Sequence, residues 1–426
     1  MRQRIGRFLF LVSFSLIFFS CLKQETPELQ PPPPQPSASD LPVLGNIESL
    51  SVPTADLGFS KLLYDGVTDS LFLISNGTVY RRKGSGQWEE FYHYEPVEEG
   101  EVGFINDAVL DGMGDFLFVT IYPSYSYPAF PYPDLPMMSV SLPQFVRIFK
   151  ISLKDGAAES IAEPGRGFPC SGLSSCPFTC PKLLYEWAYG ILYAPCDNDL
   201  YVKRDRAGEA WEKVSYPWSV TGYGPAVAFS RSGTTYFCIA EASNETYCRR
   251  ENLSWEEIGT PFEERMPDWL IGNALVYDSL QDRLLGLWNN EKRTYYAIEA
   301  VPRTIDEQQT SIPLEGIQVE GWGFDEWRSV AYIVGDDCTL YAFYDDTITS
   351  LGKIRSPGLS SDLTDLSCSV ATTVLPVNSP INSSNGSLFV PIYQKKTDPV
   401  QCPTTPCIVS LSDLLSISIS FPENDL

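Results

Sequence analysis

The sequence predicts an all-β fold, a seven-bladed β-propeller of four-stranded antiparallel blades. Two observations predict this class. Hardly any segment after residue 42 has helical periodicity, while tyrosine, tryptophan, glycine and proline are frequent there. One motif also recurs at a spacing of about 45 to 50 residues, interrupted once by an insertion, which is typical of repeat architectures. The first apolar runs of its seven copies lie near Tyr64, Leu110, Tyr185, Phe229, Tyr277, Phe324 and Val374.

Each copy predicts four short strands. An apolar run ends in an aromatic residue and often an acid, a second apolar run follows, a third ends in tyrosine and basic residues, and Trp-Glu begins the fourth. Residues 62–91 contain all four parts, whereas the last copy is poor in the motif. A four-stranded blade cannot bury its faces alone and must pack on its neighbours around a channel. We expect residues 47–52 to add a strand to the last blade and cover its open edge.

The fourth part of the motif resembles a known hairpin. The Trp-Glu pairs follow turns such as residues 205–208 and 84–86, and together they resemble degenerate Asp-box hairpins of sialidase-type propellers. In that family the Asp box is structural and lies away from the active site. The resemblance therefore supports the fold and says little about chemistry.

The N-terminus has the layout of a signal peptide. Basic residues precede an apolar run over residues 8–19, which is too short to span a bilayer, and the run ends at Ser20-Cys21. Residues 18–21 resemble the bacterial lipobox, whose cysteine becomes lipid-modified, although Phe18 stands where that family prefers Leu, Val or Ile. The alternative is a plain secretory signal with Cys21 as an ordinary thiol. Removing Cys21 from eleven cysteines leaves an even number, which favours lipidation.

Three parts of the chain follow from this reading. Residues 1–20 are the signal peptide, residues 21–42 the lipidated cysteine and its tether, and residues 43–426 the propeller. The tether contains Pro31–Pro34 and Pro36 among polar residues, a composition that prefers the extended polyproline conformation, with a reach of at most about 60 Å. We therefore expect a lipid-anchored protein of the bacterial cell envelope. Leu22 stands after the cysteine in place of Asp, and similarity to outer-membrane lipoproteins then predicts the outer membrane.

The charge excludes one class of partner. The formal net charge is −24, and neutralising phosphates requires a basic footprint. We therefore expect no nucleic acid among the partners. Solubility and charge repulsion explain the acidity without a dedicated cation site.

The irregular segments predict a binding face. In an antiparallel blade the loop between the second and third strands and the connection to the next blade leave the same face. Residues 122–144, 163–182 and 394–406 all fall there. Preordered loops with rigid aromatic side chains bind proteins or glycans well, although these rings could instead cap neighbouring loops. The candidate binding residues are Tyr122, Tyr125, Tyr127, Tyr132, Asp336 and Asp337.

The ten remaining cysteines map to this same face. We expect disulfides Cys238–Cys248, Cys338–Cys368 and Cys402–Cys407 because export favours oxidation. Cys196 is expected to pair with one of three cysteines, and the sequence leaves that choice open. A four-thiolate zinc site is the alternative, but the spacing lacks a tight C-x2-C pair, so no metal is expected. The three candidate partners of Cys196 are Cys170, Cys176 and Cys180.

The sequence contains no recognisable set of catalytic residues. His93 is the one histidine, and no phosphate-binding or dinucleotide motif is present, so no cofactor is expected. Two carboxylates suffice for a glycosidase, and Asp336 with Asp337 or Asp197 with Asp199 are best placed for that. We predict a non-catalytic envelope lipoprotein that binds a protein or glycan partner, with a glycan-processing hydrolase of sialidase-like architecture as the alternative.

Overall fold

The computed structural model describes twenty-two segments of the chain, all within the compact unit Pro36–Leu426. These are residues 42–53, 60–96, 101–125, 147–161, 182–196, 199–204, 209–217, 226–240, 246–250, 254–259, 275–287, 294–299, 310–313, 317, 319–326, 328–335, 337–344, 347–354, 372–373, 375–378, 385–396 and 408–420.

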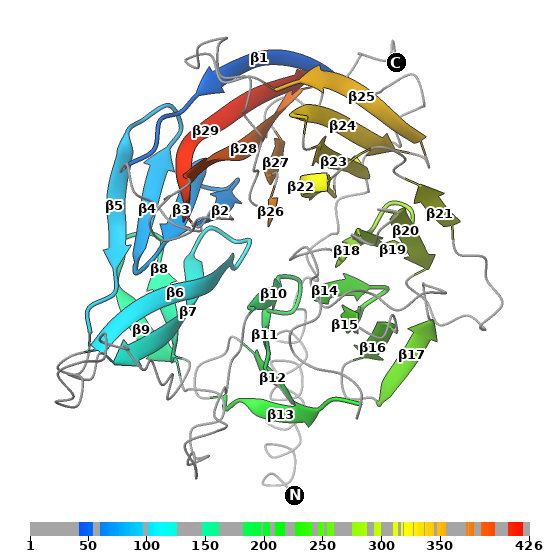
Figure 1. Ribbon diagram of the computed structural model, residues 1–426. Helices are drawn as coiled ribbons and strands as arrows, with labels where there is room; N and C mark the ends of the chain where they lie inside the picture. Colours follow the sequence, from blue (N-terminus) through cyan, green and yellow to red (C-terminus); the bar gives the residue numbers. More distant parts are fainter. Residues whose placement is uncertain are drawn as a thin grey trace, which may run out of the picture. The chain divides into compact units, whose positions relative to one another are not determined.

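In the described residues the strands form seven sheets, numbered here along the chain, and most have four antiparallel strands in sequential order (Figure 1). Sheet 1 contains β2 (Ser60–Asp65), β3 (Ser70–Ser75), β4 (Thr78–Lys83) and β5 (Trp88–His93). Sheet 2 contains β6 (Glu101–Leu110), β7 (Phe116–Tyr125), β8 (Arg147–Ser152) and β9 (Ala158–Ile161). Sheet 3 contains β10 (Leu184–Glu186), β11 (Ile191–Pro195), β12 (Asp199–Arg204) and β13 (Glu212–Ser215). Sheet 4 contains β14 (Ala226–Arg231), β15 (Thr234–Ala240), β16 (Thr246–Arg250) and β17 (Trp255–Gly259).

The last three sheets follow the same plan, except that sheet 6 has a fifth strand and sheet 7 takes its fourth strand from β1. Sheet 5 contains β18 (Leu275–Asp278), β19 (Arg283–Leu287), β20 (Thr294–Glu299) and β21 (Thr310–Pro313). Sheet 6 contains β22 (Val319–Asp325), β23 (Val330–Gly335), β24 (Thr339–Tyr344), β25 (Thr347–Lys353) and the two-residue β26 (Thr372–Thr373). Sheet 7 contains β27 (Leu375–Asn378), β28 (Asn385–Lys396), β29 (Ile408–Ser420) and β1 (Val43–Ser49).

Sheet 6 differs from the prediction because it has a fifth strand. The two residues of β26 pair in parallel with Gly321 and Trp322 of β22. The first strand of a sheet has a free edge that offers unpaired backbone groups. The chain uses that edge of sheet 6 on its way into sheet 7.

The strands are apolar to different degrees because they occupy different layers. Every residue of β3 and of β23 is buried, since the second strand of each sheet is covered by neighbouring sheets on both faces. The fourth strand β5 instead mixes exposed and half-buried residues. The continuous apolar run in the second part of the sequence motif thus marks the centre of each sheet, and the Trp-Glu part marks its edge.

Hydrophobic clusters join each sheet to the next. Phe72 of sheet 1 packs with Leu117 of sheet 2, and Tyr193 of sheet 3 packs with Phe237 of sheet 4. Further clusters join sheets 2 and 3, sheets 4, 5 and 6, and sheets 6 and 7. Leu414 of sheet 7 packs with Leu73 of sheet 1. Both faces of each sheet are therefore buried by its neighbours.

The prediction that an N-terminal strand completes the last sheet is confirmed, with different bounds. β1 pairs antiparallel with β29, from Val43 opposite Ser420 to Ser49 opposite Leu415 (Figure 1). The strand begins four residues earlier than expected and ends at Ser49. Ile47 of β1 packs against the cluster that joins sheets 6 and 7. A segment from one end of the domain thus covers the edge of a strand from the other end.

The acid of the sequence motif caps the turn between the first two strands. Asp65 accepts hydrogen bonds from the backbone amides of Val67 (3.1 Å) and Thr68 (3.2 Å). Glu186 and Asp278 make the corresponding bonds in sheets 3 and 5. These carboxylates are buried, and the amides of the tight turn supply the partners that buried polar groups require. Four residues after the acid, the backbone has a positive φ in four sheets, at Asp69, Gly190, Asp282 and Ser329.

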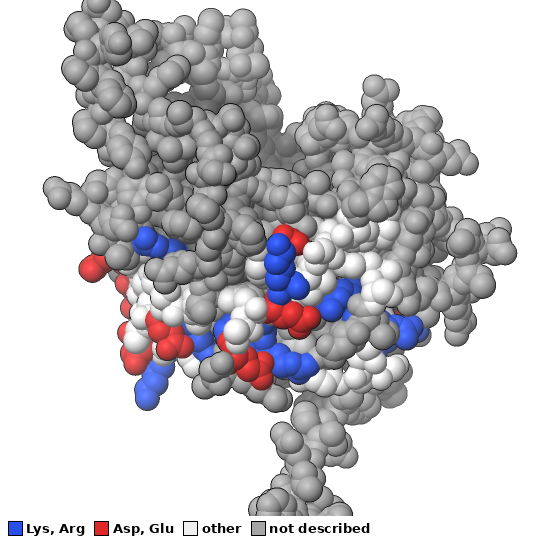
Figure 2. All heavy atoms as spheres, turned by 90° about the horizontal axis from the view of Figure 1, so that it is seen from below, with Lys and Arg blue, Asp and Glu red and all other residues white. Residues whose placement is uncertain are grey.

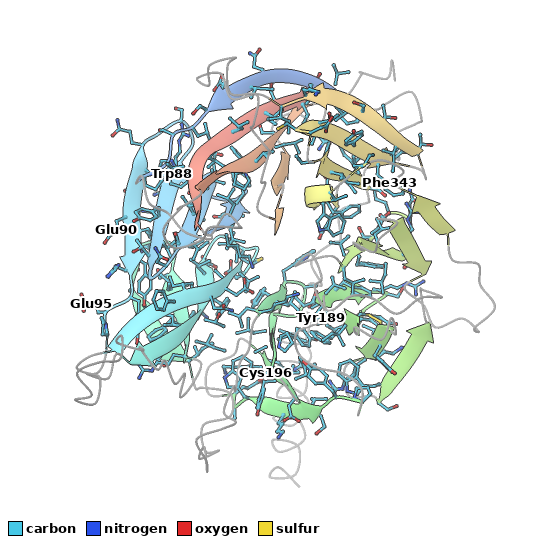
Figure 3. All side chains as sticks on the ribbon, viewed as in Figure 1. Trp88, Glu90, Glu95, Tyr189, Cys196 and Phe343 are labelled. Carbon is cyan, nitrogen blue, oxygen red and sulfur yellow. A yellow bond between two sulfur atoms is a disulfide. The ribbon has the colours of Figure 1, made fainter. Side chains whose placement is uncertain are left out.

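The tryptophan of the motif joins neighbouring sheets at their outer strands. The indole Nε1 of Trp88 donates to the carbonyl of Ser51, just after β1 (3.0 Å; Figure 3). Trp255 donates in the same way to the carbonyl of Ser215 at the end of β13 (2.9 Å). The recurrence of tryptophan thus has a structural cause, because its N–H satisfies a backbone carbonyl of the preceding sheet.

Over the described ranges, no helix is long and apolar enough to cross a membrane.

Shortening Ile417 tests the packing of the last sheet. Ile417 is fully buried between sheets 6 and 7, so Ile417→Ala should lower the free energy of unfolding by about 2–5 kcal/mol. Ser418→Ala, an exposed change in the same strand, should cost about 1 kcal/mol or less. Urea unfolding monitored by tryptophan fluorescence measures both. Equal effects of the two variants would contradict the packing described.

Candidate functional site

The two ends of each sheet carry different structures. We call the end with the turns between first and second and between third and fourth strands the turn end; in sheet 1 it comprises residues 66–69 and 84–87. The opposite end, with the connections between second and third strands and to the next sheet, is the loop end. All three predicted insertions, 122–144, 163–182 and 394–406, overlap connections at the loop end.

A disulfide joins two strands near the loop end of sheet 4. Cys238 of β15 and Cys248 of β16 are directly opposed in the sheet and bonded, with their Cα atoms 4.1 Å apart. This confirms the predicted pair. Both side chains are buried in the cluster that joins sheets 4, 5 and 6, so the bond links the base of a loop to the core.

Two other cysteines at the loop end are also disulfide-bonded. Cys196 follows β11 and is fully buried, and Cys338 lies in the turn between β23 and β24. The remaining predicted disulfide cysteines and the lipidation site Cys21 lie outside the described residues. The pairing of these cysteines and the lipidation of Cys21 stay predictions.

A charge cluster ties the loop ends of three neighbouring sheets together. Asp107 in β6 forms an ion pair with Lys61 in β2, and its other carboxylate oxygen accepts a hydrogen bond from the backbone amide of Leu183 (2.6 Å). Burial lowers the pKa of neighbouring Lys182 to about 8, and the negative charge of Asp107 opposes that shift. Lys61, Asp107 and Lys182 occupy equivalent positions, each four residues before the turn-capping acid. The cluster fixes where the connection 163–182 joins sheet 3.

The predicted binding residues are only partly described. The backbones of Tyr122 and Tyr125 continue β7 and pair with Phe104 and Glu101, which places both tyrosines at the loop end, while Tyr127, Tyr132 and Asp336 lie outside the described residues. Asp337 accepts hydrogen bonds from the backbone amide (2.9 Å) and hydroxyl (2.6 Å) of Thr339. These bonds lower its pKa, as expected for a carboxylate that accepts hydrogen bonds. Asp337 therefore caps the turn between β23 and β24.

The other acid and histidine candidates make structural contacts. Asp199 forms an ion pair with Lys213 (2.7 Å) within sheet 3, and its partner candidate Asp197 lies outside the described residues. His93 Nδ1 is 2.8 Å from the hydroxyl of Thr78 on the adjacent strand. Among the described residues, no group of three His, Cys, Asp or Glu residues could hold a metal ion.

The arginines that follow the third-strand tyrosines serve packing. Arg81 forms an ion pair with Glu89 (2.6 Å) and donates from Nη1 to the carbonyl of Leu153 in sheet 2 (2.9 Å). Figure 2 shows basic and acidic side chains interspersed over the described part of one side of the molecule. Arg231, Arg249 and Arg328 also form ion pairs with nearby acids, and these arginines lie in different parts of the domain.

The turn end carries an apolar surface that the sequence analysis missed. Val67, Met113, Trp187 and Tyr189 are large apolar residues at the tips of turns, and all are exposed. We call these four residues the apolar arc. The sequence contained a signal, because residues just after each turn-capping acid are normally small or polar. At these places sheets 1, 2 and 3 have valine, methionine and tryptophan instead.

Two tyrosines in the turn ends have raised pKa values. Tyr277 donates its hydroxyl proton to Asp282 (2.7 Å), and Tyr64 donates to Asp69 (2.8 Å). Burial, followed by the hydrogen bond and the negative charge of the acceptor, raises the pKa of both phenols. Burial and then the charge of Glu95 raise the pKa of Tyr92 to about 12. The phenols of Tyr64, Tyr92 and Tyr277 therefore stay protonated to a higher pH than an ordinary tyrosine.

Comparison with known proteins gives a fold and no family. No protein-family model and no curated protein sequence matches the chain. Among solved structures, Raptor from Chaetomium thermophilum is similar with a TM-score of 0.52 and 11% identity, covering 88% of this chain and 29% of Raptor. The extracellular domain of the putative one component system BT4673 from B. thetaiotaomicron has a TM-score of 0.51 at 11% identity, covering 88% of this chain and 40% of that one.

A second structure of BT4673, described as a putative hybrid two component system, has a TM-score of 0.50 at 11% identity, covering 87% of this chain and 39% of that one. The chain thus spans less than half the length of these three structures. They are β-propeller-like, and at such low identity the likeness shows the fold alone.

Removing the sheet 4 disulfide tests its contribution. Cys238 and Cys248 are 10 residues apart, and a loop of this size gives a stabilisation of about 2–3 kcal/mol. The double variant Cys238→Ala/Cys248→Ala should lose about that free energy of unfolding. Denaturant unfolding of the oxidised protein measures it, and an unchanged midpoint would show that the bond adds nothing to stability.

Alkaline unfolding tests the tyrosine hydrogen bonds. Because the pKa of Tyr277 is higher folded than its ordinary value of 10, its contribution to stability is complete below pH 10 and is lost as pH rises further. Tyr277→Phe should cost about 1–2 kcal/mol at neutral pH and show a weaker loss of stability above pH 10. Thermal unfolding measured between pH 7 and pH 12 compares the two proteins. Parallel curves would contradict the assignment.

Proposed function

We propose that this protein is a non-catalytic lipoprotein of the bacterial cell envelope, whose propeller binds a protein or glycan partner through its loop end. The seven sheets are the blades of one propeller closed by the pairing of β1 with β29, and Cys21 carries the lipid. The catalytic alternative has no support among the described residues, because the arginines, acids and histidine described above make structural contacts.

The observation that carries the proposal is the direction in which the chain enters the domain. Asn378 pairs with Gly386 next to the turn between β27 and β28, which marks the turn end of sheet 7. Ser420, the last residue of β29, lies at the same end, and Val43 pairs with Ser420. The tether therefore joins the domain at the turn end of sheet 7. A lipid-anchored protein of this topology would present its loop end away from the membrane.

The structures at the loop end support recognition there. The Cys238–Cys248 disulfide and the contacts of Asp107 hold the bases of loop-end connections in sheets 1 to 4. Fixing loops before binding lowers the entropy that must be lost on association. The tyrosine-rich segment 122–136 leaves this end of sheet 2 and would supply aromatic contact area.

Deleting the aromatic segment tests the recognition role. Affinity capture from the bacterial envelope should yield a specific partner with the full-length protein and lose it when residues 122–136 are deleted. A Val67→Ser variant, changed at the turn end, is the matched control and should retain capture. Equal capture by the deletion variant would remove the segment from the proposal. Turnover of a glycoside panel by the purified protein would contradict the non-catalytic role.

A further inference from the structure

The four side chains of the apolar arc are strongly exposed. The exposed fractions are 67% for Val67, 62% for Met113, 61% for Trp187 and 41% for Tyr189. Single exposed apolar residues are normal, but contiguous apolar patches mark interaction surfaces. The question is therefore whether these four side chains form one surface.

Contacts between successive turns make the arc continuous. Val67 of sheet 1 lies against Gly114 so closely that a Cβ there would be 2.8 Å from the valine side chain. Trp187 of sheet 3 lies against Gly112 in the same way, at 3.3 Å, so Met113 stands between its two neighbours. Tyr189 reaches toward Gly233 of sheet 4, whose added Cβ would lie 3.7 Å from the tyrosine hydroxyl oxygen (Figure 3). The absence of side chains at Gly112 and Gly114, both of positive φ, allows this close approach.

The chain enters the domain at the same end. Val43, itself 56% exposed, is the first residue of β1 and pairs with Ser420 at the turn end of sheet 7. Residues 22–42 precede it. If Cys21 carries lipid, the tether brings the turn end toward the bilayer surface from which it comes, at an effective concentration set by its length.

We propose that the apolar arc docks on the bilayer surface near the lipid anchor, so that the domain rests on the membrane with its loop end outward. This inference depends on the proposed lipidation of Cys21. Tryptophan and tyrosine are favoured at membrane interfaces because their rings are apolar and their N–H and O–H groups reach water. Valine and methionine at turn tips can enter the acyl boundary without burying backbone polar groups.

The charge of the protein determines on which kind of bilayer the apolar arc can dock. Asp69 and Asp115 are exposed in the same turns as Val67 and Met113, and the chain as a whole has a formal net charge of −24. An anionic surface repels such a protein. Docking is therefore driven by apolar contact on a zwitterionic bilayer and should weaken as anionic lipid is added, which is the opposite of attachment by a basic patch.

The test uses the full-length lipidated protein in phosphatidylcholine vesicles that contain brominated lipid, which quenches nearby tryptophans. Part of the tryptophan quenching should be lost in the Trp187→Phe variant. The Val67→Asp/Met113→Asp variant should lower the ratio of docked to undocked protein by tenfold or more, roughly the loss of one buried apolar side chain. Phe104→Asp is the matched control, because Phe104 is exposed (46%) on β6 near the loop end, and should leave quenching unchanged. Adding phosphatidylglycerol should reduce quenching.

Four other results would contradict the docking inference. A vesicle-bound, lipidated protein whose quenching is the same with Trp187→Phe overturns the docking inference and leaves the anchor intact. Equal losses in Phe104→Asp and the double aspartate variant also overturn it. Protection of the arc by a bound protein, without quenching by brominated lipid, assigns the surface to a protein partner instead. Mass spectrometry that finds no lipid on Cys21 overturns the anchor and the inference together.

Discussion

The structure depends on the mutual burial of neighbouring sheets. Fully buried strands such as β3 and β23 need cover on both faces, and a single four-stranded sheet cannot supply it. The clusters that join each sheet to the next meet this need, and the contact between Leu414 and Leu73 extends it from the last sheet to the first. The pairing of β1 with β29 meets a second need, because it covers the backbone edge of the last sheet.

This packing determines what each end of the sheets can do. At the turn end, buried acids such as Asp65 and Asp278 accept backbone hydrogen bonds and keep the turns short, so successive turns lie close together and Val67, Met113 and Trp187 become neighbours. At the loop end, Cys248 and Asp107 fix the bases of connections that are longer than the turns. One end therefore offers a continuous surface of short turns, and the other end carries the longer connections.

The sequence predicted an all-β fold of four-stranded antiparallel sheets because the repeated residues make the same structural contacts in several sheets. The aromatic-acid pair marks the turn at Asp65 and at Glu186, and the tryptophan marks the hydrogen bond from the outer strand to the preceding sheet. Cys238 and Cys248 could be paired because they flank a predicted short connection. The two-residue strand β26 could not be predicted, since it follows from the free edge of β22 rather than from its own residues.

The functional surfaces were harder to predict for a physical reason. Tyr122 and Tyr125 were predictable because tyrosines are frequent within one insertion, and Asp337 because it is an acid in a segment predicted at the loop end. The apolar arc is contributed one or two residues at a time by three separate repeats, so it has no local pattern. It becomes visible only when Gly112 and Gly114 bring the turns of sheets 1 to 3 into contact.

On a membrane we expect the two ends of the sheets to face opposite ways, with the turn end toward the bilayer and the loop end away from it. The most direct measurement is the rate at which a bulky, membrane-impermeant maleimide labels Val67→Cys and Phe104→Cys variants of the lipidated protein. On phosphatidylcholine vesicles, Val67→Cys should react more slowly than in detergent, while Phe104→Cys should react at the same rate in both. Equal protection of the two cysteines, or protection of Phe104→Cys alone, would contradict the account.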